Sequence, residues 1–172
     1  MPFTPFHMGP GILVKAFMGS AFSLMIFGWT QIVMDIQPLI VLLSGEGHLH
    51  GFSHTYLGAA LIAIFSAVTG KYLAQFGLRL LGMTSALRLE FAWWVVFLSA
   101  FIGSFSHVLL DSVMHADVQP FYPATEANTL LGVIPLALLH KLCLYSGLLG
   151  AAIYYGLQWL RKTAIDRVSQ GQ

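Results

Sequence analysis

The stretch with the clearest capacity for chemistry runs from Ser106 to His115 and places His107, Asp111 and His115 at four-residue intervals. On a helix these side chains line one face, each about 6 Å along the axis from the next. An imidazole and a carboxylate at this spacing can bind one divalent ion, and the second imidazole can serve another. A buried hydrogen-bonded pair or a pH sensor is the alternative interpretation.

A second group of histidines comes just before an apolar segment, at His48, His50 and His54. Gly51 disfavours a helix at this point, so His50 and His54 need not share a helical face. We therefore predict that His54 is a metal ligand and that His50 supports it or faces a substrate. His48 is expected to be a solvated loop residue.

Three more residues extend the set of ligand types. Asp35 ends a long apolar segment, where the helix macrodipole disfavours a carboxylate unless a cation or the solvated headgroup region compensates it. His7 precedes a short helix and His140 lies in an apolar one, so each also fits a surface or packed histidine. Taken together, these six or seven nitrogen and oxygen ligands suit two or three zinc-like ions at one end of a helical core.

The composition shows what kind of fold must position these residues. Of 172 residues, 57% are hydrophobic and 9% are charged, whereas a soluble domain has about 25% charged residues. The net charge of +1 leaves no basic face for a phosphate backbone, so nucleic-acid binding is not expected. A chain this apolar retains few polar groups without a use for them.

Four segments free of Asp, Glu, Lys and Arg approach the roughly 20 residues that cross a bilayer as a helix, namely 16–34, 55–70, 91–110 and 142–160. The predicted fold is an all-α, polytopic membrane bundle of about four spanning helices. A short half-crossing helix over 9–18 is expected to precede a full one over 21–35. The region 129–160 exceeds the membrane thickness, and its first part, with His140 and Lys141, is expected to project beyond the bilayer.

The charges predict an orientation, because loops rich in Lys and Arg stay cytoplasmic. Seven of the eight basic residues fall at one set of helix ends: Lys15, Lys71, Arg79, Arg88, Arg161, Lys162 and Arg167. Most acids and histidines fall at the other, so the metal site is expected at the extracytoplasmic face. Residues 1–160 form a single integral membrane metal-binding domain in this interpretation, and 161–172 a polar cytoplasmic tail.

Several motifs resemble one known family. They are Pro5-Phe6-His7-Met8-Gly9-Pro10, Met34-Asp35-Ile36-Gln37-Pro38, His50-Gly51-Phe52-Ser53-His54-Thr55, and Ser106-His107 through Asp111 to Pro120. In this order, from residue 3 to about 150, they resemble the YdjM-like family of bacterial inner-membrane metal-dependent hydrolases. That family is grouped with zinc-dependent phospholipases C and fungal zinc nucleases.

The resemblance implies a ligand set. Asp35, His54, His107 and Asp111 would share one zinc, Asp111 would bridge to a second ion bound by His7, and His115 with His140 would hold another. The soluble enzymes also use the N-terminal amine and a His-x-x-x-Glu pair, whereas Met1-Pro2 precedes His7 by several residues and Leu144 follows His140. Of the one to three zinc ions implied, with manganese as a substitute, one or two are therefore expected.

The leading hypothesis is a membrane-embedded metal-dependent hydrolase that uses metal-activated water on phosphoesters, including lipid headgroups. Asp35 would act as base, while His50, Asp117 or Asn128 would contact the leaving group or support the ligands. The expected partners are a phosphoester or lipid substrate and the membrane lipids. A divalent metal transporter, a haem or diiron protein, and a non-catalytic metal-binding protein are the alternatives.

Overall fold

The computed structural model describes residues 5–82 and 91–169, and within those ranges the chain forms helices and no strands. The all-α prediction is confirmed. In chain order the elements are η1 (Pro5–His7), α1 (Met8–Met18), η2 (Gly19–Ala21), α2 (Leu24–Met34), α3 (Ile36–Ser44), η3 (Phe52–His54), α4 (Tyr56–Leu80), α5 (Trp93–Met114) and α6 (Leu136–Ser169).

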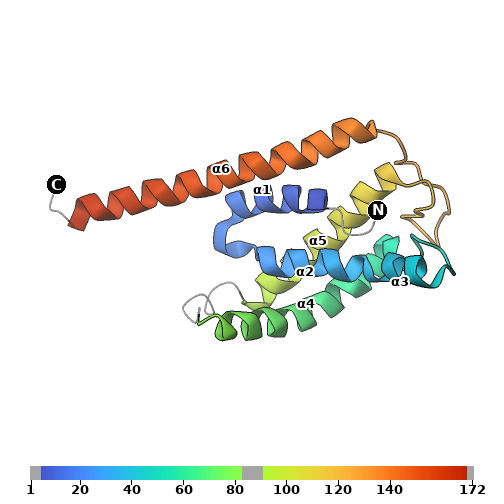
Figure 1. Ribbon diagram of the computed structural model, residues 1–172, viewed down its shortest axis with the longest axis horizontal. Helices are drawn as coiled ribbons and strands as arrows, with labels where there is room; N and C mark the ends of the chain where they lie inside the picture. Colours follow the sequence, from blue (N-terminus) through green and yellow to red (C-terminus); the bar gives the residue numbers. More distant parts are fainter. Residues whose placement is uncertain (1–4, 83–90, 170–172) are drawn as a thin grey trace.

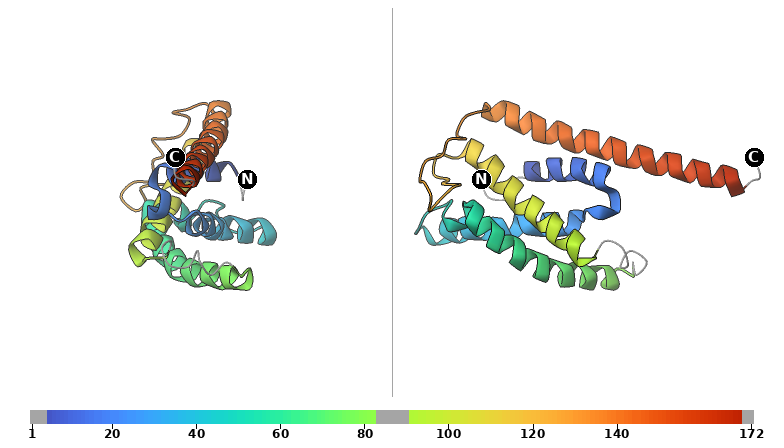
Figure 2. Two further views of the ribbon diagram at one scale, coloured as in Figure 1. Left: turned by 90° about the vertical axis from the view of Figure 1, so that its left-hand side faces the viewer. Right: turned by 180° about the vertical axis from the view of Figure 1, so that it is seen from behind.

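Four helical segments are long and apolar enough to cross a membrane, as predicted: Leu24–Ser44, Tyr56–Leu80, Trp93–Met114 and Leu136–Arg167. Figures 1 and 2 show them running along a common direction, with α4, α5 and α2 grouped together and α6 on the other side of α1. The chain is therefore a multi-pass helical membrane protein.

α1 has the length of a half-crossing helix, as the sequence predicted. Its 11 residues give about 16 Å, roughly half of a hydrocarbon core. Gly19 follows with a positive φ of 54°, which glycine adopts without strain, and the chain turns back into α2. Lys15 is buried inside this hairpin, where its Nζ donates a hydrogen bond to the Phe22 carbonyl oxygen at 2.8 Å.

The first full span continues past Asp35, although the sequence predicted that the helix ends there. α2 stops at Met34 and α3 starts at Ile36, so Asp35 lies at a break within the segment Leu24–Ser44. Pro38 explains the break, since it cannot donate the hydrogen bond that the Met34 carbonyl would accept in a continuous helix. Because Pro38 lies in the first turn of α3, a helix can still follow, and the predicted end at Asp35 is corrected to Ser44.

The core that carries the site lies between α2, α4 and α5. Small side chains such as Ala63 and Ala67 on α4 and Ala100 on α5 are fully buried there, which lets the helix backbones approach closely. Thr55 caps α4 by accepting a hydrogen bond from the Gly58 amide at 2.9 Å. The residues just before α4 and near the end of α5 are thereby held at the same end of the bundle.

α6 packs along α1 and extends beyond the other helices at its C-terminal end (Figures 1 and 2). It begins only after Pro135 and continues as helix through Arg161 to Ser169. The helix therefore starts later and ends later than the apolar region 129–160, and its C-terminal part is the one that projects beyond the other helices.

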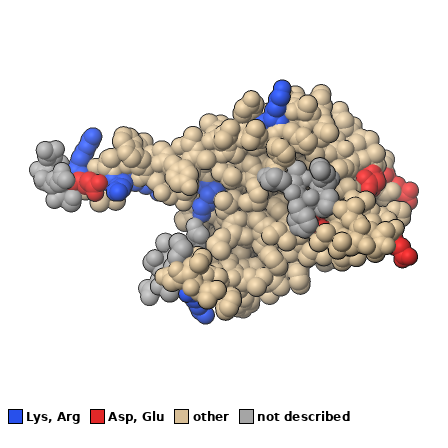
Figure 3. Space-filling view, viewed as in Figure 1, with Lys and Arg blue, Asp and Glu red and all other residues tan. Residues whose placement is uncertain are grey.

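Charge is distributed unevenly along the long axis. Figure 3 shows most of the visible acidic side chains at the end formed by the connecting loops, and most of the basic ones toward the hairpin and the C-terminal part of α6. Arg88, one of the seven basic residues of the predicted charge pattern, lies outside the described residues.

Candidate metal centre

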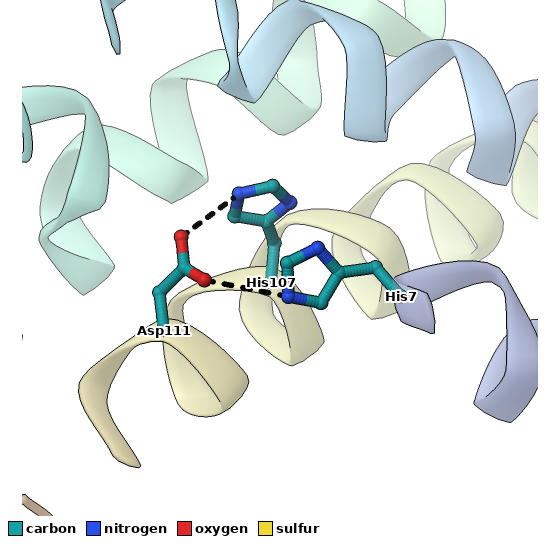
Figure 4. A group of neighbouring side chains, drawn as sticks. All are labelled: His7, His107 and Asp111. Carbon is teal, nitrogen blue, oxygen red and sulfur yellow. Dashed lines mark ion pairs between the residues drawn. The ribbon is translucent and has the colours of Figure 1, made fainter. Parts of the chain in front are cut away.

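Asp111 is the centre of a buried cluster of histidines. It is 3% exposed, and the nearest imidazole nitrogens are His107 Nε2 at 3.2 Å and His54 Nε2 at 3.3 Å from Oδ2, and His7 Nε2 at 3.3 Å from Oδ1. Two more lie at 4.0 Å, His50 Nε2 from Oδ2 and His115 Nε2 from Oδ1. Figure 4 shows His7 and His107 directed at the same carboxylate from different helices.

Each of these side chains is positioned by the end of an element. His107 and Asp111 face one another because they are four residues apart on α5. His7 ends η1 just before α1, and His54 ends η3 just before α4. The α2–α3 break places Asp35 Oδ1 3.5 Å from His107 Nε2.

Three of the imidazole nitrogens that face Asp111 are buried without forming a hydrogen bond within the described part of the chain. Nε2 of His7, His54 and His107 is buried and has no hydrogen-bond partner among the described residues, although carboxylate oxygens lie 3.2–3.5 Å away. Buried polar atoms in proteins are normally satisfied. Donor atoms bound to one tetrahedral zinc lie about 3.3 Å apart, so the observed spacing fits shared ligation of an ion.

Gln31, which was not among the predicted site residues, fixes the tautomer of His107. The amide nitrogen of Gln31, in α2, donates to the Gly103 carbonyl oxygen at 2.9 Å, which leaves its Oε1 to accept from His107 Nδ1 at 2.7 Å. With its proton on Nδ1, neutral His107 presents a bare Nε2 toward Asp111 and Asp35. A lone pair that faces carboxylate oxygens is stabilised either by a cation bound between them or by a second proton on the ring.

The other histidines are also supported from outside the cluster. His50 Nδ1 contacts both Asp117 oxygens, at 2.9 and 3.0 Å, in the carboxylate–histidine arrangement common around metals. His54 Nδ1 bonds to Ser53 Oγ at 2.8 Å, and Gln37 Oε1 accepts from the Ser53 amide at 3.1 Å. Ser53 and Gln37, like Gln31, were not predicted, and only their position within four residues of a predicted ligand could have marked them.

Electrostatics outside the membrane-spanning segments favour the ligand forms. Burial lowers the pKa of His54, and the contact with Asp111 offsets this only in part, so the ring is neutral. Burial likewise lowers the pKa of His115. Partial burial acts to raise the pKa of Asp117, but the hydrogen bond to His50, the charge interactions with His50 and His115 and a backbone hydrogen bond together outweigh it, and the pKa is lowered.

Among the described residues, two sets of ligand atoms flank Asp111. The inner group consists of Asp35, His54 and His107, and with Asp111 Oδ2 it offers four nitrogen and oxygen ligands from three elements. The outer group consists of His50, His115 and Asp117, which are close enough together to share an ion. His7 approaches the second oxygen of Asp111, which suits a bridging carboxylate.

Not every predicted residue joins this centre. His140 is not among the described groups of ligands; it stacks on Phe6 with ring centroids 4.8 Å apart, because α6 packs along α1 and η1. The Asn128 amide donates to the main-chain carbonyls of Ser112 and His115 and so caps α5. His48 is exposed in the loop, as expected.

A cavity of about 300 Å³ adjoins the outer group. It is lined by His48, His50, Gly51, Phe52, Thr55, Asp117, Gln119 and Tyr122. His50 thus lines the cavity while its Nε2 faces Asp111. A polar molecule in this cavity would lie beside the cluster.

Fold and site together define a multi-pass helical membrane protein with a buried His/Asp centre at one end of the bundle. The model of the YdjM inner membrane protein family matches residues 13–165, and the chain belongs to that family. No curated protein and no solved structure matches the chain.

Proposed function

We propose that the protein is a metal-dependent hydrolase of phosphoesters in the bacterial inner membrane, with its centre at the extracytoplasmic face. The observation that carries the proposal is the convergence of three buried, unpartnered imidazole nitrogens on one carboxylate. Nitrogen and carboxylate donors in this mixture suit zinc, with manganese as a substitute.

In this proposal some of the residues would hold metal ions, and others would take part in the reaction. The inner group with Asp111 Oδ2 would hold one ion closed in, and Asp111 Oδ1 with His7 would hold a second with fewer protein ligands. Bound there, zinc supplies an activated water and neutralises charge that develops on the phosphoryl oxygens.

The remaining steps are proton transfers by side chains. Asp35, beside His107, is placed to accept the proton of the attacking water, as predicted from the sequence. His50 lines the polar cavity with its Nδ1 held by Asp117, so it is placed to donate a proton to the leaving group.

The burial of the inner group favours a resident ion over a transported one. His54 and His107 are fully buried, and their Nε2 atoms are closed off from solvent. A transporter must load and release its cargo at each cycle, usually from a site open in turn to each side. We therefore place metal transport second.

The experiment uses the full chain in lipid nanodiscs. We expect one or two zinc ions per chain and metal-dependent hydrolysis of bis(p-nitrophenyl) phosphate or a phospholipid, both lost in Asp111→Asn. Glu46→Gln, which makes the same acid-to-amide change at an exposed position of the loop before the histidines, is the matched control and is expected to retain both. Wild type without bound metal, or full activity in Asp111→Asn, contradicts the proposal; zinc uptake by proteoliposomes without hydrolysis would favour the transporter.

The proposed orientation is tested separately. In a Cys143→Ala background, Glu46→Cys marks the loop near the centre and Lys162→Cys marks the far part of α6. A membrane-impermeant maleimide applied to spheroplasts is expected to label the first and spare the second. The reverse pattern would place the centre on the cytoplasmic side.

A further inference from the structure

An apolar groove lies between α1 and α6, apart from the polar cavity. It has a volume of about 370 Å³, within the usual range for small-ligand sites of about 300–1,000 Å³. Phe6, Met8 and Ile12 line it on one side, and Leu144, Leu148 and Ala151 on the other. From Cys143 to Ala151 it follows α6 for about 12 Å, more than a third of a hydrocarbon core.

Glycines create this groove. A side chain at Gly9 would collide with the Cys143 backbone, and one at Gly150 with the backbone of Leu13, so α1 and α6 cross in close contact. Gly147 packs on Gly9 and adds no side chain to the seam. Leu144 and Leu148 are left beside the crossing with much of their surface exposed.

One end of the groove is lined by Phe6 of η1, the residue that precedes His7 of the metal centre. Phe6 lines the groove and stacks on His140, while the next residue, His7, is buried with its Nε2 3.3 Å from Asp111 Oδ1. A molecule lying in the groove would therefore have its head beside His7 and His140, one residue from the cluster.

The chemistry of the groove selects one kind of occupant. Its lining is almost entirely carbon, and it opens on membrane-spanning helices, where the surrounding medium is hydrocarbon. A protein helix is about 10 Å across and does not fit in this volume. A flexible hydrocarbon chain matches both the lining and the narrow, elongated course along α6.

We propose that this groove binds an acyl chain of the substrate, so that the substrate is a membrane phospholipid and not a water-soluble phosphoester. The inference rests on the proposed hydrolase function. Asp111 connects the two sides: Oδ1 faces His7, next to the groove, and Oδ2 faces His50, which lines the polar cavity. The chain would lie in the groove, the phosphate at the centre, and the headgroup toward the polar cavity.

The first test detects binding without turnover. A phospholipid with a photoreactive diazirine in its acyl chain is incorporated into nanodiscs with the full chain, and the cross-linked residues are mapped by mass spectrometry. We expect cross-links concentrated on Met8, Ile12, Leu144 and Leu148, and their loss in Leu148→Trp, which fills the groove. Leu149→Trp is the matched control, since Leu149 is 54% exposed against 60% for Leu148 but does not line the groove.

The second test compares substrates. In Leu148→Trp the ratio of kcat/KM for a long-chain phospholipid to that for bis(p-nitrophenyl) phosphate is expected to fall about tenfold or more, and in Leu149→Trp to stay as in wild type. An unchanged ratio in both variants, or cross-links spread evenly over the lipid-facing side of α6, would mean surrounding bilayer lipid only and would overturn the proposal. If metal-loaded wild type hydrolyses neither substrate, the hydrolase function fails, while the cross-linking still decides whether the groove binds a chain.

Discussion

The inner and outer groups of ligands on either side of Asp111 differ in how they are built. The inner group stands on packed elements: His107 is on α5, His54 comes directly before α4, and Asp35 lies at the α2–α3 break, all buried. The outer group stands on connecting segments, and two of its side chains are partly open, with His115 28% and Asp117 53% exposed, while His50 is buried.

Under the proposed function, this difference suits the two groups to different tasks. Ligands locked in a packed core are held in one geometry, which favours tight binding of an ion. Ligands on loops beside a polar cavity can reach a substrate and exchange protons with it. Asp111 lies between the two groups, so a substitution at Asp111 tests both of them together. A substitution within one group tests that group alone.

Asp111→Asn is expected to have the largest effect. The amide is nearly the same size but removes the negative charge that five histidines surround among the described residues, so the ion of the inner group and the second ion beside His7 should both be lost. Metal analysis of the purified variant should give values near zero, with helical content by circular dichroism as in wild type. Retention of one full ion would show that the inner group binds without its shared carboxylate.

Changing one histidine in each group should separate them. His107→Ala removes a ligand of the inner group and should weaken zinc binding by more than about 100-fold, beyond the effect of a supporting residue. His115→Ala should leave the tightest ion in place, because its Nε2 is 4.0 Å from Asp111. Competition with a coloured chelator measures both; equal losses would contradict the division into a tight inner and an open outer group.

The sequence was sufficient to predict the spanning helices and much of the inner group. Charge-free runs mark spans because a bilayer excludes charge, and the four-residue spacing of His107 and Asp111 places them on one face of any helix. Asp35 and His54 were marked by their positions beside apolar segments, the resemblance to a known family implied that they share an ion, and the structure brings both to the same point.

Other features depend on packing that spacing does not specify. Nothing local shows that α6 packs along α1, yet this contact is what turns His140 to Phe6 and away from His115. Gln31 is a single amide in an apolar run, and its role depends on two groups of α5, His107 and the Gly103 carbonyl, more than 70 positions along the chain. The predicted span ended at Asp35 because a carboxylate was expected to close the apolar helix, whereas the chain continues as α3, which tolerates Pro38 in its first turn.

Gln31→Met tests the support of the inner group and should have a smaller effect. Methionine fills a similar volume but cannot accept the Nδ1 proton of His107, so the ring loses its fixed orientation. Zinc affinity is expected to fall about 10- to 100-fold, the usual cost of losing such a partner. Thr30→Val is the matched control, since that buried hydroxyl bonds only to the Ile26 carbonyl of its own helix among the described contacts; a similar loss there would mean general disturbance of α2.

Asp117→Ala should have the smallest effect on metal and a selective one on turnover. Asp117 is half exposed and contacts His50 alone among the described ligands, so zinc affinity is expected to fall by about tenfold at most, while hydrolysis slows because His50 is no longer oriented toward the cavity. Asp117→Asn keeps an oxygen that can accept from His50 Nδ1, and should restore part of the rate. Glu46→Ala removes an exposed acid from a neighbouring loop and should change neither quantity. If instead Asp117→Ala removes the tightly bound ion, the outer group is needed to hold metal, and the contrast between a holding and a reacting side of Asp111 is wrong.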